Sequence, residues 1–326
     1  MEALDVICLG ELLIDFVSLD RDVSLAESSG FKKAPGGAPA NVAAGVARLG
    51  LKAGFIGKVG HDPFGAYLRK VLGDLQVDTE YLVADPDART TLSFVAQKSD
   101  GVRDCMFYRN PGADMLLRPD ELDAGYFEGA TFFHFGSISL GAEPVKSATL
   151  KAIEMSRAKG LLISYDPNLR MSLWPDEETA RREINAGFPF ADVVKISEEE
   201  YGFILGCDTP ESCAEAILAM GPKLVVVTLG PKGCYYSDGV HAGYLPTFDD
   251  VTVVETTGAG DAFVAATLAG IIARLKEGDP DALSADEAFV RILTFANAAG
   301  SLATTKIGAI PSLPTTDEVL AFLAVH

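Results

Sequence analysis

The chain has 326 residues, of which 48% are apolar and 22% charged, as in an ordinary globular protein. Its formal net charge of −19 argues against a nucleic-acid-binding surface or an anionic membrane face, because both repel a strongly acidic protein. No apolar run is long enough to span a membrane, and residues 1–9 lack the features of a secretory signal, so we expect a cytoplasmic protein.

Short apolar runs separated by helical stretches recur along the chain. They are rich in Val, Ile, Leu and Phe and nearly continuous, which is typical of parallel strands covered on both faces. This alternation predicts an α/β fold with a doubly wound, mostly parallel sheet flanked by helices. No repeat or Pro/Gly/Ser-rich linker interrupts the pattern, so we expect a single domain over residues 1–326. The predicted strands are residues 5–10, 54–60, 131–136, 161–166, 192–197 and 224–230.

Two segments, residues 11–35 and about 90–110, do not follow this alternation. In the second segment, two strand-like runs flank Ser99-Asp100-Gly101, a good hairpin turn signal. We expect both segments to stand outside the main sheet as a small β-structure. It is either an exposed ornament or a lid over a binding site. The run Phe107-Tyr108-Arg109 favours the lid, because these side chains would be costly to display together in solvent.

Residues 34–41, APGGAPAN, precede a small-residue helical pattern. Gly36 and Gly37 let the backbone approach a ligand, because neither carries a Cβ. Asn41, in the predicted first turn of the helix, offers both a donor and an acceptor to a hydroxyl group. The same residues also suit an ordinary turn and helix cap, so this segment alone does not establish a binding site.

Polar residues follow several predicted strands at their carboxyl ends, the edge of an open α/β sheet where ligands bind. Any one of them is compatible with a cap or turn, but together they predict a polar cleft. These residues are Glu11, Asp15, Asp166, Asn168, Arg170, Ser197, Glu200 and Gly230.

Residues 255–263, ETTGAGDAF, lead into a helical pattern over residues 261–275. Gly258, Ala259 and Gly260 are therefore expected at a helix N-terminus, where free N–H groups and the helix dipole favour an anion. Asp261 in the first turn is also an ordinary capping choice. Three backbone donors beside a carboxylate nevertheless suit phosphoryl transfer. The donors stabilise charge on the transferring group, and the carboxylate accepts the proton of the attacking hydroxyl.

Other cofactor and metal chemistries are disfavoured. The P-loop pattern GxxxxGK[ST] is absent, and GAGDAF breaks GxGxxG at its last position and lies late in the chain, so neither a P-loop enzyme nor a nicotinamide dehydrogenase is expected. The five cysteines form no CxxC pair, which predicts reduced, buried thiols. The four histidines, His61, His134, His241 and His326, have no zinc-ligand spacing.

The two glycine-rich motifs, PGGAPANVAAGVARLG and DVTVVETTGAGDAFVAA, occur in the order and at the separation found in the ribokinase-like (PfkB) carbohydrate kinases. The chain resembles this family over roughly residues 4–323. FYRNPGADMLL (107–117), DPNLR with LW (166–174) and KISEEE (195–200) look more like fructokinases than ribokinases or adenosine kinases.

The resemblance implies ATP-dependent phosphorylation of D-fructose on its 6-hydroxyl, with 2-keto-3-deoxygluconate kinase or another sugar kinase of the family as the alternative. A catalytically silent sugar sensor of the same fold would have lost the base or the anion hole, and both are present here.

The resemblance also implies roles for individual residues. Asp261 would be the catalytic base, with the backbone N–H groups of Gly258, Ala259 and Gly260 as its anion hole. The sugar would be held by Asp15, Gly36, Gly37, Asn41, Arg170 and Asp261, with Phe107 and Arg109 reaching in from the lid. The ATP site would be lined by Lys195, Thr228, Gly230, Gly233 and Asn297, together with Gly258 and Gly260.

Mg²⁺ and a monovalent cation, K⁺, are implied as further cofactors. Glu200 matches the acid of the family's NxxE motif, which acts on the magnesium–phosphate network. Ser197 stands in place of the motif's asparagine, so Mg²⁺ is expected to be held more through water. Glu255 stands where the family usually has aspartate and is one methylene longer. The K⁺ positions would be Glu255, Thr257, Ala303, Lys306, Gly308 and Ser312.

The expected partners are the sugar and ATP, with no nucleic acid and no membrane. The exposed β-lid is expected to pair with a second copy of the chain in a homodimer.

Overall fold

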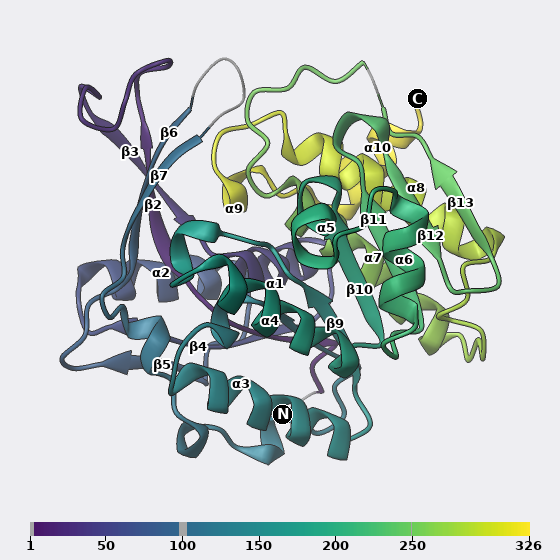
Figure 1. Cartoon of the computed structure of the whole chain (residues 1–326), viewed down its shortest axis with the longest axis horizontal. Helices are drawn as coiled ribbons and strands as arrows, with labels where there is room; N and C mark the ends of the chain where they lie inside the picture. Colours follow the sequence, from purple (N-terminus) through teal and green to yellow (C-terminus); the bar gives the residue numbers. More distant parts are fainter. Residues whose placement is uncertain (1–2, 98–102, 249) are drawn as a thin grey trace.

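The computed structural model describes residues 3–97, 103–248 and 250–326, which form a nine-stranded and a four-stranded sheet (Figure 1). The larger sheet has the order β13-β12-β11-β10-β9-β8-β1-β4-β5. Its neighbours are parallel from β11 to β5, and β12 and β13 add an antiparallel edge. The strands are Val6–Leu9 (β1), Ala53–Gly60 (β4), Leu82–Asp85 (β5), Phe132–Gly136 (β8), Leu162–Asp166 (β9), Val193–Ser197 (β10), Leu224–Thr228 (β11), Cys234–Ser237 (β12) and Ala242–Leu245 (β13).

The six predicted strands are confirmed as β1, β4, β8, β9, β10 and β11, and the doubly wound, mostly parallel architecture is confirmed with them. Strands β5, β12 and β13 have no counterpart among the predicted strands. β5 and β13 are the two edge strands, where burial is less complete: β13 alternates between exposed and half-buried residues. Edge strands of this kind do not produce the continuous apolar run by which a central parallel strand is recognised. β12 is mostly buried, but it is only four residues long and contains no Val, Ile or Leu.

Two apolar cores, one on each face, hold the helices to the large sheet. Alternate residues of β1 show the division: Val6 and Cys8 belong to one core, and Ile7 and Leu9 to the other. The first core contains side chains of α1 (Ala38–Arg48), α2 (Pro63–Asp74), α7 (Ala259–Lys276), α8 (Glu287–Ala303), α9 (Ala309–Ser312) and α10 (Thr316–Leu323). The second contains side chains of α3 (Val145–Ala158), α4 (Glu177–Gly187), α5 (Glu198–Leu205) and α6 (Pro210–Leu218).

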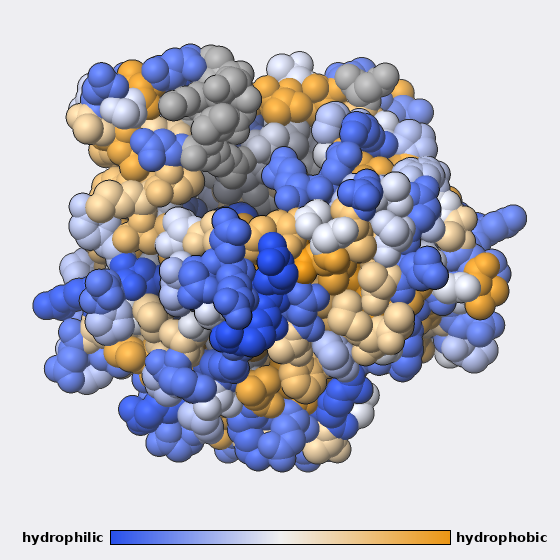
Figure 2. Space-filling view, viewed as in Figure 1, coloured by the Kyte–Doolittle hydropathy of each residue, from blue (hydrophilic) through white to orange (hydrophobic). Residues whose placement is uncertain are grey.

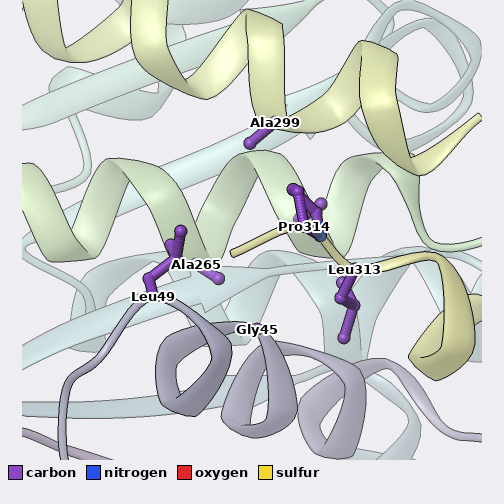
Figure 3. Close-up of a pocket in the computed structure, with 7 residues that line it drawn as sticks. Gly45, Leu49, Ala265, Ala299, Leu313 and Pro314 are labelled. Atoms are coloured by element: carbon purple, nitrogen blue, oxygen red, sulfur yellow. The ribbon is translucent and has the colours of Figure 1, made fainter. Parts of the chain in front are cut away.

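Helices α1, α7 and α8 approach closely through small residues (Figure 3). A Cβ on Gly45 would lie 2.7 Å from the Cβ of Ala265, so only glycine fits at that point of contact. The small pocket between these helices is lined by apolar residues alone, Ala299 and Leu313 among them, and therefore offers no polar group to a ligand. Close packing of α1 against α7 matters for the site, because each helix carries a predicted site residue in its first turn.

The four-stranded sheet comes from the two segments that interrupted the alternation in the sequence. Its order is β3-β2-β6-β7, with β2 and β6 parallel and the outer pairs antiparallel. The predicted turn at Ser99-Asp100-Gly101 lies outside the described residues. Figure 2 shows that the visible face of the molecule is hollowed between this sheet and the body of the larger sheet. The strands are Leu13–Ser18 (β2), Phe31–Gly36 (β3), Leu92–Gln97 (β6) and Arg103–Tyr108 (β7).

Aromatic rings line one face of the small sheet. Phe16 and Phe94 stack with ring centroids 5.0 Å apart, and Phe31 and Tyr108 meet the ring of Phe94 edge-on. The ring of Tyr108 and the side chain of Met106, which lies opposite Phe94 on β7, are more than half exposed. The sheet therefore presents apolar surface outward at its free edge strand.

Two observations refine the sequence expectations. The expectation of buried thiols is wrong in part: Cys8, Cys213 and Cys234 are buried, whereas Cys105 on β7 and Cys207 after α5 are half-buried, and none of the five forms a disulfide. Among the described residues, no helix has the length and apolar character that crossing a membrane requires.

Candidate active site

The candidate site lies where the carboxyl ends of the central strands meet. The chain winds outward in one direction from β1 and in the other from β8, so β1 and β8 flank the topological switch point of the sheet. In such sheets the crevice beyond the strand ends at this point is the place where ligands bind. The predicted site residues that follow β1, β9, β10 and β11 therefore lie at the same edge of the sheet, the one formed by the carboxyl ends of the strands.

The first turn of α7 contains Asp261, with a carboxylate that does not cap the helix. The N-cap is Gly258, at φ +85°, and no side chain caps this N-terminus. A Cβ on Gly258 would lie 2.9 Å from the Cα of Ala309, so glycine is required both for the left-handed backbone and for space. Among the described residues, no side chain accepts from the first backbone N–H groups of α7, although the Ala259 N–H donates to the Thr256 carbonyl at 3.3 Å. An anion-binding helix terminus needs N–H groups without a side-chain acceptor.

Asp261 and Asn41 meet across the site although 220 positions separate them. The Asn41 Nδ2 donates to the Asp261 Oδ2 at 2.8 Å, and both side chains are buried. The Asn41 Oδ1 is also buried but has no hydrogen-bond partner among the described residues. An unpaired buried acceptor costs free energy, so it indicates a place for a donor such as a sugar hydroxyl.

A buried ion pair lies beside Asp261. Val194 on β10 pairs with Tyr165 on β9, and one residue further along these strands the Lys195 Nζ lies 3.2 Å from the Asp166 Oδ2. Burial lowers the pKa of Lys195, but the charges of Asp166, Glu200 and Asp261 outweigh it and raise that pKa, so the ammonium stays charged.

Burial raises the proton affinity of two carboxylates of this cluster, Asp166 and Asp261. Burial raises the pKa of Asp166 to about 6, with Lys195 opposing and Glu200 and Asp261 adding to the increase. Burial likewise raises the pKa of Asp261, against the opposing effects of Asn41, Lys195 and Arg170. A carboxylate whose proton affinity is raised in this way is better suited to accept a proton during a reaction.

Lys195 lies under the predicted anion hole. A Cβ built on Gly260 would be 3.2 Å from the Lys195 Nζ, so the ammonium lies directly beside the first turn of α7. The sequence placed Lys195 in the ATP site. The structure places its ammonium beside Gly260, between the other residues of the predicted ATP site and Asp261.

The small sheet contributes Asp15 and the two glycines at the end of β3. Asp15 on β2 leans over Gly36, where an added Cβ would come within 2.1 Å of its Oδ2. Gly37, at φ +113°, lies against the backbone carbonyl of Glu11, and the Glu11 Oε1 accepts a hydrogen bond from the Ala38 N–H at 2.8 Å. Gly36 and Gly37 were predicted to let the backbone approach a ligand; the atoms that an added Cβ would meet at these positions are protein atoms of residues 11–15.

The remaining predicted sugar contacts differ in exposure. Phe107 on β7 is half-buried, and Arg170 is exposed and donates to the carbonyl of Leu169. Arg109 does not project freely from the end of the strand. Its Nε is bound to the Asp114 Oδ2 at 2.7 Å, and its side chain is 7% exposed. Arg109 is thus anchored at the base of the small sheet.

The residues predicted for the ATP site lie at the end of β11 and on α8. The Thr228 Oγ1 donates weakly to the carbonyl of Ile196, and Gly230 (φ +56°) and Gly233 (φ +98°) form the turn that follows. A Cβ on Gly233 would lie 2.0 Å from the Leu245 carbonyl oxygen, so that turn requires glycine. Asn297 is buried and donates to the Pro246 carbonyl at 3.2 Å.

Glu200 links the β9 loop to α5. Its Oε1 accepts from the Leu169 N–H at 2.6 Å, and its Oε2 accepts from the N–H and hydroxyl of Ser197. Among the described residues, no set of three or more carboxylate, His or Cys side chains converges on a metal position.

Hydrogen bonds join three of the residues predicted to hold a monovalent cation, Glu255, Thr257 and Gly308. The Glu255 Oε1 accepts from the Thr257 hydroxyl at 2.6 Å, and its Oε2 accepts from the Gly308 N–H at 2.8 Å. Ala303 and Ser312 are also buried, whereas the Lys306 Nζ lies 3.5 Å from the Glu318 Oε1.

The structure adds four residues to the site or its support: Glu11, Asp114, His134 and Asp166. The sequence analysis named Glu11 and Asp166 as strand-end residues without a defined role. Asp114 had no sequence signal beyond lying five positions after Arg109. His134 on β8 bonds Ser164 at 3.0 Å. Burial, and then the charge of Lys195, lowers its pKa to about 3, so His134 is a neutral support beneath the ion pair.

The chain is similar to known sugar kinases over nearly its whole length. The pfkB family carbohydrate kinase model matches residues 3–316. Fructokinase-1 of Zea mays is 50% identical over 322 residues, which cover 98% of this chain and 97% of that protein. The crystal structure of a fructokinase from Xylella fastidiosa with bound ATP has a TM-score of 0.89 at 33% identity, covering 98% of both chains. A double mutant of a fructokinase from Vibrio cholerae O395, crystallised with fructose, ADP and potassium ion, has a TM-score of 0.85 at 33% identity, covering 99% of both chains.

Proposed function

Because the chain belongs to the pfkB family of carbohydrate kinases, we propose that it is an ATP-dependent fructokinase that converts D-fructose and ATP to fructose 6-phosphate and ADP. The observation that carries this proposal is the contact between Asn41 and Asp261, which joins the two glycine-rich motifs at the N-terminus of α7. A hydroxyl placed there can donate to the free Asn41 Oδ1 and lies next to the carboxylate that would take its proton.

The reaction forms one bond and breaks another. The sugar 6-oxygen bonds to the γ-phosphorus, the bond from that phosphorus to the bridging oxygen of ADP breaks, and the hydroxyl proton passes to Asp261. The N–H groups of Gly258, Ala259 and Gly260 stabilise the negative charge on the transferring group, and the nearby Lys195 ammonium adds to that stabilisation. Mg²⁺, when bound near Glu200, neutralises phosphate charge.

The two sheets are proposed to act as one kinase domain, with the four-stranded sheet as a lid over the sugar. Asp15, Phe107 and the Gly36-Gly37 turn lie on or next to the lid, and Asn41 and Asp261 lie beneath it. Closure of such a lid excludes water, which would otherwise compete with the sugar for the phosphoryl group.

Fructose should be the preferred acceptor in a coupled ADP-release assay that also includes 2-keto-3-deoxygluconate, ribose and adenosine. The basis is the similarity to fructokinases in sequence and structure. Faster turnover of 2-keto-3-deoxygluconate at matched concentrations would assign the chain to that alternative activity. Faster turnover of ribose or adenosine would contradict the fructokinase proposal in the same way.

Potassium should stimulate turnover. The buried Glu255 carboxylate joins Thr257 to Gly308, so a cation beside it would order the loop that ends at the anion hole. The assay compares potassium chloride with tetramethylammonium chloride at equal ionic strength. Equal rates in the two salts would rule out a functional cation. If sodium chloride, measured in the same way, stimulated turnover as much as potassium chloride, the site would not be selective for potassium.

The lid is proposed to pair with a second copy of the chain through its aromatic face. Met106 and Tyr108 are more than half exposed beside the ring of Phe94, and such apolar surface is typical of an interface. Light scattering should therefore give a dimer for the wild type and a monomer for Met106→Glu, because the charge would be desolvated in the interface. A control, Val325→Glu at the exposed C-terminal end, should remain dimeric. A monomeric wild type would exclude this assembly.

A further inference from the structure

Four chain crossings connect the lid to the rest of the molecule, and buried polar groups join them. The crossings are residues 10–12 between β1 and β2, Gly37 between β3 and α1, residues 86–91 between β5 and β6, and residues 109–112 after β7. Together these four segments form what we call the lid base. Any movement of the lid relative to the main sheet must be absorbed here.

Glu11 joins the first crossing to the second. Its Oε1 accepts from the Ala38 N–H at 2.8 Å, and its backbone carbonyl lies so close to Gly37 that a Cβ there would approach within 2.2 Å. Glu11 is 4% exposed, and α1 has no side-chain cap from its own N-cap residue. The Glu11 carboxylate therefore supplies the acceptor that the start of α1 would otherwise lack.

Thr91, Arg109 and Asp114 join the third crossing to the fourth. Asp114 accepts from the Thr91 hydroxyl and, at 2.7 Å, from the Arg109 Nε. Gly112 completes the packing, because a Cβ on it would lie 1.8 Å from the Thr91 Oγ1. The Ile14 N–H donates to the carbonyl of Thr91. The third crossing is therefore also bound to β2, the strand that follows the first crossing.

The lid base contains two carboxylates, Glu11 and Asp87, and two guanidiniums, Arg89 and Arg109, and Asp114 lies two residues beyond it. Asp114 and Arg109 are the charged groups that act on Glu11, the first raising and the second lowering its proton affinity. Burial is the largest cause and, against the hydrogen bonds that Glu11 receives, raises the pKa of Glu11 to about 7. Glu11 therefore changes charge in the range in which a cytoplasmic enzyme works.

We propose that Glu11 is a positioning residue of the sugar site, whose ionised carboxylate fixes the Gly36-Gly37-Ala38 turn and thereby places Asn41 and Asp15, and whose protonation loosens that turn. The link to the sugar is short. The Asn41 N–H donates to the Gly37 carbonyl at 2.8 Å, and Asp15 packs on Gly36. The inference deepens the proposed function, on which it rests, because it concerns the same sugar site.

The test compares wild type with Glu11→Gln, measuring the fructose KM and the thermal midpoint of each between about pH 6 and pH 8, on either side of the raised pKa. At the upper pH the variant lacks a charged acceptor that the wild type has, so its fructose KM should be roughly tenfold higher. At the lower pH the wild-type carboxyl is itself neutral, and the ratio of the two KM values should approach one. The KM for ATP should change little at either pH.

The thermal midpoint separates positioning from general support of the fold. The pKa of Glu11 is raised on folding, so its stabilising contribution is complete below the unfolded value and is lost as the pH rises through the folded value. A neutral glutamine avoids that loss. The thermal midpoint of Glu11→Gln minus that of wild type should therefore increase with pH. This increase should occur over the same pH range in which the fructose KM of the variant rises above that of wild type.

A control is Asp192→Asn. Asp192 is also buried and accepts from one backbone N–H, that of Ile163, but it pairs with Lys223 at 3.0 Å and lies at the opposite end of the strands. Its KM ratio to wild type should stay near one at every pH. For Glu11→Gln, a KM ratio that does not change with pH, or a fall in thermal midpoint parallel to the rise in KM, would overturn the proposal. Absence of fructose turnover by the wild type would instead contradict the proposed function.

Discussion

Replacing Asp261 with asparagine is expected to lower turnover by roughly 10²–10⁴-fold while leaving sugar and ATP affinities close to wild type. The carboxylate is the only group in the proposed reaction that accepts the hydroxyl proton, and this interaction develops only as the oxygen attacks. An amide has nearly the same shape but no comparable basicity. The loss should therefore appear in kcat and leave KM nearly unchanged.

The fold should tolerate Asp261→Asn. Asp261 does not cap α7, so no helix-terminal hydrogen bond is lost. Its contact with Asn41 can be kept without rotation, because the Asn41 Nδ2 can donate to the oxygen of the new amide and the Asn41 Oδ1 stays available to the sugar hydroxyl. Burial raises the pKa of Asp261, so its ionisation opposes folding as the pH rises, and the neutral amide removes that penalty.

The decisive measurement sets kcat beside the thermal midpoint and sugar binding in the same variant. Turnover within about threefold of wild type would show that Asp261 is not the base and would contradict the mechanism, since general-base assistance is worth far more. If the thermal midpoint fell together with kcat, the fold tolerance argued above would be wrong. Direct sugar binding at room temperature would then separate a damaged site from a missing base.

Replacing Lys195 with methionine should damage both stability and catalysis. The change removes the cation paired with the buried Asp166 carboxylate, which keeps only the hydrogen bond from the Asn168 N–H among its described contacts, and breaking a buried pair on one side costs about 3–5 kcal/mol. Asp261 and Glu200 also lose the nearest cation that acts on them. Turnover should fall roughly 10²-fold, the order found for loss of one group that stabilises charge in a transition state.

A second substitution distinguishes the two effects. In Lys195→Met with Asp166→Asn, no unpaired charge is left from the broken pair, so chemical denaturation should show most of the lost stability restored. Turnover should stay low, because the ammonium beside Gly260 is still missing. Lys232→Met serves as a control at an exposed ion pair, where little should change. Full recovery of turnover in the double variant would mean that Lys195 acts only by pairing Asp166.

The central part of the fold was predictable from the sequence because its physical signal is local. A parallel strand buried on both faces is apolar along most of its length, and β1, β4, β8, β9, β10 and β11 are each such a run, although β4 contains Lys58 and β10 contains Lys195. The turn that starts α7 was equally predictable, since only glycine adopts the backbone at Gly258 without strain. The edge strand β13 lacks this signal because solvent covers part of it, and β12 is only four residues long and contains no Val, Ile or Leu.

The partners of the site residues were decided only by the tertiary structure. Asn41 and Asp261 lie 220 positions apart, and nothing in either motif states that their side chains touch. Arg109 was predicted to reach in to the sugar from the lid, and only the structure shows that Asp114 and the packing around Gly112 hold it at the lid base. Strand register, not composition, placed Lys195 beside Asp166. Residue type sets what a group can donate, accept or titrate, whereas burial and distance in the folded chain set which of these it does, as the raised pKa of Glu11 shows.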